Sequence, residues 1–244
     1  MSYYRETAHF GGFFVYYQFV IRMEVEFKIS KDGSSTLFVP ALNEHYHSMN
    51  GAITEAKHVY VDQGLNFFIN SSLSTSEINI LEIGFGTGLN GLVTLLNGGS
   101  NLINYDGLEL NPLDHEILSQ LNFTQQLNEE SNSVFEIISS ANWNEEVTIG
   151  NNFNLNKLHT SIFEWQPKRV YHVVYFDAFA PEIQPEMWEV TVLQKIADAT
   201  ARGGVLTTYC AKGEVRRRLQ AVGFKVFRIP GPPGKREMIR AVKQ

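Results

Sequence analysis

The order of apolar and polar residues separates an irregular N-terminal part of the chain from a regularly alternating remainder. Beyond residue 77, short apolar runs typical of buried strands alternate with segments whose apolar residues recur every three or four positions, as in helices. Strands are expected at residues 78–84, 102–111, 153–162, 170–179, 205–210, 224–229 and 236–243. Helices are expected at residues 88–99, 112–123, 186–204 and 212–223, with a further helix and a loop within 135–150. This alternation predicts an α/β fold with a mostly parallel sheet, in which the last two strands pair antiparallel at one edge because no helix separates them.

The N-terminal part has a different pattern. Residues 25–30 and 36–40 predict two short strands around a Lys-Asp-Gly turn, and residues 41–69 predict a mainly helical segment. A serine-rich loop follows, so we expect a boundary between residues 73 and 77. The expected organisation is an N-terminal extension (1–22), a strand and helical segment (23–76) and a core domain (77–244).

The first 22 residues contain an aromatic run with Arg5 before it and Arg22 after it. The residues after this run offer no small-residue cleavage site of the kind that a signal peptide requires. Met23 begins a plausible strand and could be the true start. Three interpretations therefore stay open: an upstream extension without function, a packed edge strand or helix, or a targeting segment.

Composition narrows the class of protein. The chain has 244 residues, 43% of them hydrophobic, which is enough for one sizeable core. No apolar run reaches the roughly 18 residues of a membrane-spanning helix, so we expect no membrane partner. The single cysteine, Cys210, excludes an internal disulfide framework and a cysteine-cluster metal site, and it fits a cytoplasmic protein.

Three glycines follow the first strand of the alternating region, at Gly84, Gly86 and Gly88. Ligands of a parallel α/β sheet bind beyond the carboxyl ends of its strands, where glycines let the backbone turn tightly and approach the ligand. The dinucleotide-binding pattern would place glycine or alanine at position 89, which is Leu89 here, and the Gly-Lys-Ser/Thr of a P-loop is missing. The glycines therefore indicate a ligand without a diphosphate, unless they form only a tight turn between a strand and a helix.

Glu109 ends the next expected strand, at the same edge of the sheet. A carboxylate at that place can accept hydrogen bonds from both hydroxyls of a ribose. A glycine turn and a ribose-binding carboxylate together suit an unphosphorylated nucleoside, of which S-adenosyl-L-methionine is the common example. The alternative is that Glu109 is merely a solvated strand end.

Asp177 ends another apolar strand and should reach this edge as well. An alkylamine has a pKa of about 10, so it is mostly protonated at neutral pH and unreactive as a nucleophile. A carboxylate can hold such an amine and accept its proton, which frees the lone pair for attack on an activated methyl group. The alternative is that Asp177 only caps the helix that follows.

Three segments together resemble one protein family. They are residues 82–90 (EIGFGTGLN), 176–188 (FDAFAPEIQPEMW) and 234–241 (GKREMIRA). In combination they resemble the methyltransferase part of the bacterial enzymes that complete 5-methylaminomethyl-2-thiouridine at the tRNA wobble position. Residues 42–66 are similar to the stand-alone branch of that family, and the resemblance runs from about Asp32 to Ala241.

This resemblance implies a class I, Rossmann-like S-adenosylmethionine-dependent methyltransferase fold. It implies methylation of the exocyclic amine of 5-aminomethyl-(2-thio)uridine in tRNA. In two-domain relatives, a flavin-dependent oxidase domain follows and makes that amine. This chain ends at Gln244, so we expect no flavin domain here and a separate enzyme that makes the 5-aminomethyl group.

The resemblance also assigns roles to residues. It implies that Asp177 meets the amine and that the cofactor is bound by Glu82, Gly84, Gly86, Gly88 and Glu109. Substrate contacts are expected at Tyr46, Ser48, Phe179, Tyr209, Lys235 and Arg236. Relatives commonly have Gly-Asp near the adenine, where this chain has Thr160 and Ser161, and this leaves the adenine contacts open.

The distribution of charge supports an RNA partner although the formal net charge is −6. From residue 202 to the end, the chain has eleven basic residues and only two acidic ones. Such an asymmetry favours nucleic-acid binding, and we expect tRNA to bind this basic C-terminal region. The alternative is a solvated helix face with scattered strand-edge charges. His45 and His47 lie close together, but no third ligand has a suitable spacing, so no metal is expected.

Rival functions on this kind of fold are an aminopropyltransferase and a small-molecule amine methyltransferase, which also need a carboxylate facing an amine. A nicotinamide oxidoreductase is disfavoured by Leu89. A non-catalytic RNA-binding module would have no need for Glu109 and Asp177 at one edge.

Overall fold

The computed structural model describes residues 9–10, 13–14, 24–71, 73, 75–128 and 130–244. The extension expected at residues 1–22 lies outside the described residues, apart from a short antiparallel pair formed by β1 (His9–Phe10) and β2 (Phe13–Phe14).

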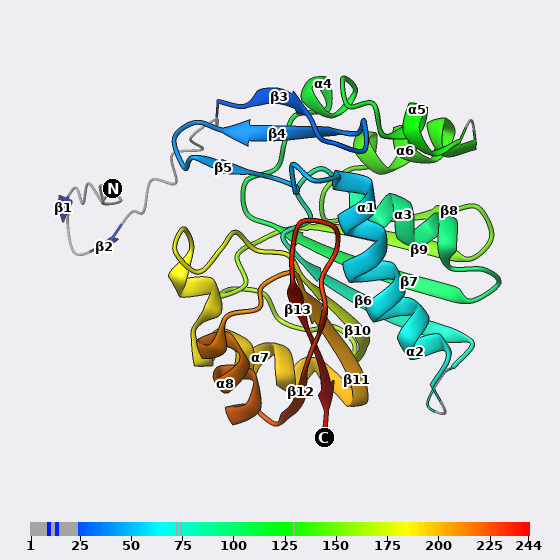
Figure 1. Cartoon of the computed structure of the whole chain (residues 1–244). Coiled ribbons are helices and arrows are strands. Elements are labelled where there is room, and N and C mark those ends of the chain that lie inside the picture. Colours follow the sequence, from blue (N-terminus) through cyan, green and yellow to red (C-terminus); the bar gives the residue numbers. More distant parts are fainter. Residues whose placement is uncertain (1–8, 11–12, 15–23, 72, 74, 129) are drawn as a thin grey trace.

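The main element is an eight-stranded sheet with the order β12-β13-β11-β10-β6-β7-β9-β8 (Figure 1). Its strands are β6 (Glu77–Ile83), β7 (Leu102–Glu109), β8 (Glu146–Ile149), β9 (Phe153–His159), β10 (Tyr171–Phe176), β11 (Thr200–Thr208), β12 (Phe224–Pro230) and β13 (Glu237–Lys243). The five strands β6, β7, β9, β10 and β11 pair in parallel. β13 is antiparallel to both of its neighbours, so the mostly parallel sheet with an antiparallel last strand is confirmed.

Several details differ from the sequence-based expectation. The helix expected at residues 112–123 is only four residues long, at His115–Leu118. The segment expected to be mainly helical at residues 41–69 contains a short strand, Glu44–His45, before its helix begins at Ala52. β8 is an additional antiparallel strand at the edge next to β9, in a stretch that we expected to be loop. β11 begins at Thr200, whereas the expected helix ran on to Gly204. Residues 200–204 already belong to the strand, and a shift in register between Tyr171 and Val173 accommodates them.

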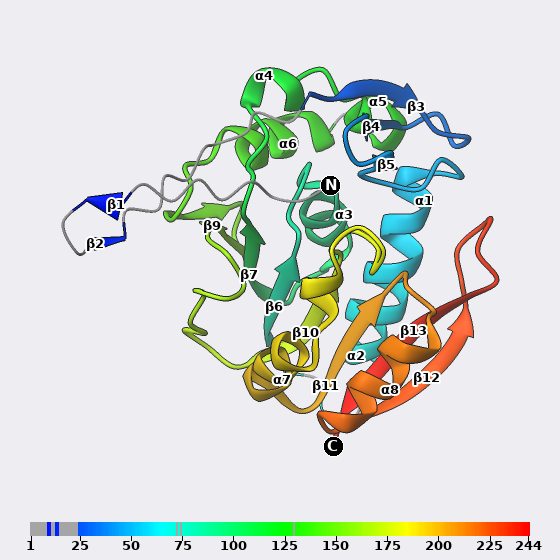
Figure 2. The ribbon, with the colours of Figure 1, turned by 90° about the vertical axis from the view of Figure 1, so that its left-hand side faces the viewer.

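Helices cover both faces of the sheet (Figures 1 and 2). They are α1 (Ala52–Ala56), η1 (Lys57–Asn66), α2 (Phe67–Ile69), α3 (Leu89–Asn97), α4 (His115–Leu118), α5 (Phe123–Leu127), α6 (Glu130–Ser140), the 3₁₀-helix η2 (Pro185–Trp188), α7 (Val190–Ala199) and α8 (Gly213–Ala221). One core contains side chains of η1, α3 and α6, and the other contains side chains of α7 and α8. None of the helices in the described part of the chain has the length and apolar character needed to cross a bilayer.

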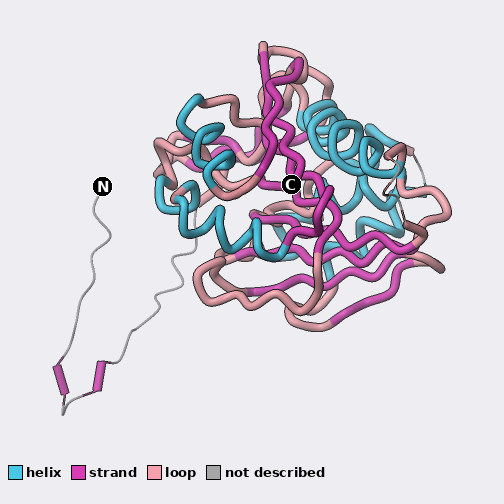
Figure 3. Tube along the Cα trace, turned by 90° about the horizontal axis from the view of Figure 1, so that it is seen from below, coloured by secondary structure: helices cyan, strands magenta, loops and turns pink. Residues whose placement is uncertain are grey.

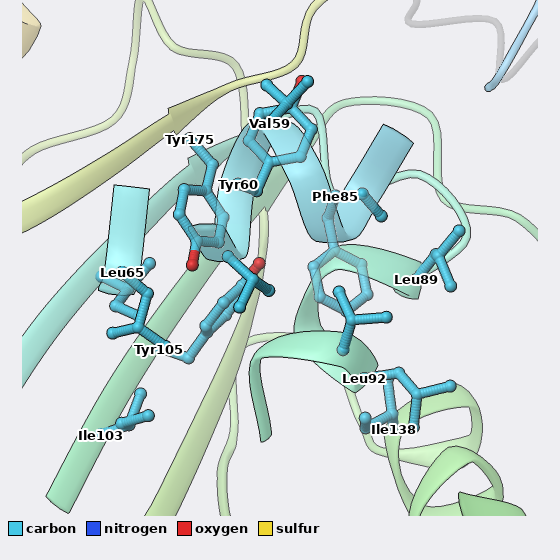
Figure 4. Close-up of a cluster of buried hydrophobic side chains, with 14 of the residues drawn as sticks. Val59, Tyr60, Leu65, Phe85, Leu89, Leu92, Ile103, Tyr105, Ile138 and Tyr175 are labelled. Atoms are coloured by element: carbon cyan, nitrogen blue, oxygen red, sulfur yellow. The ribbon is translucent and has the colours of Figure 1, made fainter. Parts of the chain in front are cut away.

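Strand alternation decides which core each side chain enters. In β10, Val173 and Tyr175 join the core on the η1 side, whereas Val174 and Phe176 join the opposite core. The next residue in the same alternation as Tyr175 is Asp177. Figure 4 shows the ring of Tyr175 close to Tyr60 and Tyr105 in the first core.

The N-terminal segment packs onto the main sheet. Its three-stranded antiparallel sheet consists of β3 (Glu26–Ile29), β4 (Ser35–Val39) and β5 (Glu44–His45). The helical run that follows is continuous from Ala52 to Ile69, and its middle part, η1, is a π-helix. Seen from below, the β12–β13 hairpin extends between two groups of helices (Figure 3).

Candidate active site

The carboxyl ends of β6, β7 and β10 meet at one edge of the sheet. The backbone amides of Gly84 and Phe85 both donate to the carbonyl of Leu108, at 3.0 and 2.9 Å. The amide of Asp177 donates to the carbonyl of Ile83 at 2.9 Å. The three predicted features, the glycine turn, Glu109 and Asp177, are therefore brought together at one edge, as the parallel strands required.

The glycine turn needs residues without a side chain. Gly84 has a φ of +88°, and a Cβ built on it would lie 2.6 Å from the carbonyl oxygen of Asp177. Gly86 has a φ of +51°, and its Cβ would lie 3.2 Å from the ring of Tyr46. Gly88 immediately precedes α3. The turn thus passes close to the backbone after β10 on one side and to the N-terminal segment on the other.

Glu109 is bound to the glycine turn. Its Oε2 accepts a hydrogen bond from the amide of Gly86 at 3.0 Å, and its Oε1 accepts one from the amide of Asn111 at 2.8 Å. Burial raises the pKa of Glu109, and the hydrogen bonds from Asn111 and Gly86 oppose that rise because they favour the charged form. Each oxygen keeps a second lone pair with which it could accept a hydrogen bond from a ligand.

Asp177 is held at both carboxylate oxygens. Tyr60 donates its hydroxyl to Oδ1 at 2.5 Å, and Asn90 donates its Nδ2 to Oδ2 at 2.8 Å. Burial raises the pKa of Asp177 to about 7, against the hydrogen bonds from Tyr60 and Asn90, which lower it. Asp177 can therefore take up and release a proton near neutral pH, which is the property that a general base needs.

Glu82 lies behind Asp177. It is fully buried, and its carboxyl group accepts hydrogen bonds from Tyr105 at 2.7 Å and from Asn90 at 2.8 Å. Burial raises the pKa of Glu82 well above its usual value, and the nearby charge of Asp177 adds to that rise. Asn90 thus bridges two acidic side chains, and the predicted cofactor contact of Glu82 stays a prediction.

Aromatic side chains surround Asp177 and the turn. The rings of Tyr46 and Phe179 meet edge to face at 5.5 Å. Tyr209 donates its hydroxyl to the carbonyl of Ala178 at 2.9 Å, and the ammonium of Lys235 lies 4.0 Å from the centre of the Tyr209 ring. These four predicted substrate residues come from four separate segments of the chain and lie around one edge of the sheet.

The other two predicted substrate residues are placed differently. The backbone amide of Ser48 donates to Glu55 Oε2 at 2.9 Å, and its hydroxyl accepts from the amide of Asn50 at 3.2 Å. Arg236 is exposed, and its carbonyl accepts a hydrogen bond from the amide of Gly231. Their contact with a substrate stays a prediction.

Sequence reasoning missed three residues of the site: Tyr60, Asn90 and Glu55. Asn90 belongs to the segment that carried the family resemblance, so its position relative to the glycines could have identified it. Tyr60 lies 117 residues before Asp177, and no local pattern indicates that the two meet. Glu55 accepts a hydrogen bond from Lys235 at 2.7 Å across a separation of 180 residues.

The two neighbouring histidines make different contacts. The ring of His45 packs against Phe38 at 4.7 Å, whereas His47 forms hydrogen bonds with Thr36 at 3.3 Å and with Thr87 at 3.1 Å. Burial lowers the pKa of His47 to about 4, so the ring is neutral at physiological pH. Among the described residues, no group of three or more His, Cys, Asp or Glu side chains has an arrangement that could hold a metal ion.

The basic C-terminal residues fall into three groups. Four are in ion pairs, namely Lys212 with Glu182, Arg218 with Glu189, Arg228 with Glu237, and Lys235 with Glu55. In the part of the chain that the structure describes, no side-chain hydrogen bond or ion pair is formed by Arg202, Arg216, Arg217 or Arg236. The remaining three, Lys225, Arg240 and Lys243, lie over the aromatic rings of Phe227, Phe67 and Phe224 and have no acidic partner among the described residues. The last two groups therefore carry positive charge that no ion pair neutralises.

The strand order, the glycine turn after β6 and the acidic residue at the end of β7 define the class I methyltransferase fold. The chain belongs to the family described as S-adenosyl-L-methionine-dependent methyltransferase (Methyltransf_30), which matches residues 123–244, half of its length.

Individual relatives agree with this family. The chain is 30% identical over 227 residues to the tRNA 5-methylaminomethyl-2-thiouridine biosynthesis bifunctional protein MnmC of Cupriavidus metallidurans, covering 86% of this chain and 32% of that protein. It therefore spans about a third of the length of the curated relatives it matches. The crystal structure of MnmC2 from Aquifex aeolicus superimposes with a TM-score of 0.73 at 25% identity, over 91% of this chain and 71% of that one.

The resemblance inferred from the sequence motifs is thus confirmed. A probable spermidine synthase from Corynebacterium glutamicum also superimposes, with a TM-score of 0.52 at 14% identity over 90% of this chain and 76% of that one. This second likeness shows a shared fold alone.

Proposed function

We propose that this chain methylates the exocyclic amine of 5-aminomethyl-(2-thio)uridine at the tRNA wobble position, with S-adenosyl-L-methionine as the methyl donor. The observation that carries the proposal is the carboxylate of Asp177, which is held by Tyr60 and Asn90 beside the glycine turn. The names of the relatives from Cupriavidus and Leptospira support the tRNA nucleoside as the acceptor.

The residues of the turn fit the methyl donor. Gly84 and Gly86 have no side chain, so a ligand can approach the backbone of the turn closely. Each carboxylate oxygen of Glu109 has a lone pair left to accept a hydrogen bond from a ribose hydroxyl. Thr160 follows β9 directly, and its amide donates to the carbonyl of Glu109 at 3.1 Å, which places it next to the residue that would hold the ribose. When bound, S-adenosylmethionine supplies a methyl group that its positive sulfur has already activated.

Asp177 prepares the amine. Its ionised carboxylate accepts a hydrogen bond from the substrate ammonium group and then the proton itself, so that the nitrogen lone pair becomes available. Bound S-adenosylmethionine would supply the methyl group to that lone pair, and its sulfur would keep the electron pair of the S–C bond. Asp177 then returns its proton to solvent. Much of the rate should come from alignment of amine and methyl group, since little other activation is required.

Binding of tRNA is proposed to involve the unpaired arginines of the C-terminal region. Arg217 is exposed on α8, and Arg236 is exposed in the loop between β12 and β13, next to Lys235. Phosphate contacts of this kind supply affinity that decreases as the salt concentration rises. The amine itself must be formed by a separate enzyme, or by a separate domain, that removes the group masking it.

Transfer to a small-molecule amine is the second candidate, because a carboxylate facing an amine is also what an aminopropyltransferase or small-molecule methyltransferase needs. The basic C-terminal region disfavours a polyamine, which is itself positively charged.

The test is transfer of labelled methyl from S-adenosylmethionine to tRNA from cells that lack this enzyme, followed by nucleoside analysis. The expected result is a new labelled 5-methylaminomethyl-(2-thio)uridine peak. Cofactor binding without any labelled tRNA would overturn the acceptor and leave a small-molecule amine as the substrate.

A further inference from the structure

We propose that Tyr60 is a positioning residue that holds Asp177 ready to act as the base, and that the π-helix η1 brings it there. This inference rests on the proposed role of Asp177 but not on the identity of the amine that Asp177 meets.

The π-helix is the first observation. Such helices are rare, occur mostly as single widened turns, and are frequent at functional sites. Here η1 extends over ten residues, Lys57–Asn66, within a helical run that is α-helical before and after it. Tyr60 lies in its first turn, and its side chain is 1% exposed.

Contacts on several sides fix the position of η1. A Cβ on Gly64 would lie 3.0 Å from the ring of Tyr175 and 3.2 Å from Thr207 Oγ1, so this glycine allows η1 to approach β10 and β11 closely. Arg240 of β13 donates to Gln63 Oε1 at 2.8 Å, and its guanidinium lies 3.7 Å from the ring of Phe67. The helix that carries Tyr60 is therefore held against three strands of the sheet.

The hydroxyl of Tyr60 donates to Asp177 Oδ1 at 2.5 Å. Its ring packs on Tyr175 with 5.1 Å between the ring centres. Together with Asn90, Tyr60 fixes the plane of the carboxylate and leaves one lone pair on each oxygen for a substrate amine. A hydrogen bond to the ionised form also stabilises that form, so Tyr60 keeps Asp177 charged in a site whose burial favours the neutral acid.

Other charged or titratable groups act on Asp177 from the elements around it. They are Glu55 of α1, Glu82 of β6, Tyr105 of β7, Tyr209 after β11, and Lys235 of the β12–β13 loop. The test must therefore change Tyr60 without changing these groups.

Tyr60→Phe meets that condition, because it removes only the hydroxyl and keeps the packing of the ring. Tyr175→Phe is the matched control, since Tyr175 is also fully buried and touches Tyr60, but its hydroxyl accepts a hydrogen bond from Thr94 Oγ1 at 3.2 Å. The direct measurement is the titration of the Asp177 carboxyl carbon by NMR in protein labelled with ¹³C at aspartate, assigned with Asp177→Asn. In Tyr60→Phe, the pKa of Asp177 should rise by about one unit, and in Tyr175→Phe it should stay at the wild-type value.

Replacement of Tyr60 by 3-fluorotyrosine is the second variant. A more acidic phenol donates a stronger hydrogen bond, so the pKa of Asp177 should fall, in the direction opposite to Tyr60→Phe. An unchanged titration in both Tyr60 variants would overturn the positioning role. This readout needs no acceptor, so it remains informative if the tRNA proposal fails.

Activity gives the complementary readout. The loss of kcat/KM in Tyr60→Phe should be about tenfold below the pKa of Asp177 and should shrink at alkaline pH, with the KM for S-adenosylmethionine unchanged. An equal loss at every pH would instead indicate a merely structural role.

Discussion

The ammonium group of Lys235 lies 2.7 Å from the carboxylate of Glu55, which joins the loop of the β12–β13 hairpin to the first helix of the N-terminal segment. The same ammonium group packs over the ring of Tyr209. Of the two charges, Lys235 lowers the pKa of Asp177 and Glu55 raises it. The pair therefore connects the N-terminal segment to the C-terminal hairpin and also changes the pKa of the proposed base.

Removing one member of this pair should move the acidic limb of the pH–activity profile. Lys235→Met takes away a positive charge, so the pKa of Asp177 should rise and activity at neutral pH should fall several-fold. Glu55→Gln should move the limb to lower pH. Lys225→Met is the control, because Lys225 is exposed and lies over the ring of Phe227. A shift of the same sign in both variants of the pair would contradict this electrostatic explanation.

Asp177→Asn should reduce methyl transfer by about 10²–10⁴-fold while S-adenosylmethionine still binds, because the amide cannot accept the proton of the amine. Initial rates and equilibrium binding would be measured together. Asp198→Asn is the control, since Asp198 is exposed on α7. Full activity of Asp177→Asn with normal cofactor binding would show that the assigned role is wrong.

The same variant should remove the contribution of Asp177 to the pH dependence of stability. The folded-state pKa of Asp177 is raised from 3.8 to about 7, so the folded protein holds this proton more tightly than the unfolded chain does. The resulting contribution to stability is complete below pH 3.8 and is lost as the pH rises towards 7. At pH 8, the free energy of unfolding of Asp177→Asn should therefore exceed that of the wild-type protein by about 2–4 kcal/mol. Urea unfolding at pH 5 and pH 8 measures the difference, which should be smaller at the lower pH.

Gly84→Ala should destabilise the protein by about 2–4 kcal/mol and weaken cofactor binding, because the new methyl group would press on the backbone of Asp177 at a positive φ. Gly99→Ala is the matched control. Gly99 also has a positive φ, +62°, but nothing lies within 4 Å of its Cβ position, so only about 1 kcal/mol should be lost. Equal losses in the two variants would mean that the contact with Asp177 carries no strain.

Glu109→Gln should weaken the binding of S-adenosylmethionine and of S-adenosylhomocysteine to the same extent, by about tenfold or more. Both molecules have the ribose that Glu109 is proposed to bind, but only the first has a positive sulfur. Calorimetric titration with both ligands distinguishes a ribose contact from attraction to the sulfonium, which would affect S-adenosylmethionine alone. Glu116→Gln, on the exposed face of α4, is the control.

The apolar pattern of the chain determined the alternation of strands and helices, and with it the edge of the sheet at which Gly84, Glu109 and Asp177 gather. Those predictions succeed because strand periodicity is local and because all parallel strands end at the same edge. The pattern did not predict the extra strand β8, because a strand of only four residues carries too little periodic signal.

Only the tertiary structure decided what surrounds Asp177. Tyr60 reaches it from a π-helix 117 residues away, Asn90 bridges it to Glu82, and Lys235 meets Glu55 across nearly the whole chain. None of these contacts follows from local propensity, because each depends on how the N-terminal helix and the C-terminal hairpin pack against the sheet. The tertiary structure likewise decided which basic residues are already paired with an acid, and thus which positive charges stay free for the proposed contact with tRNA.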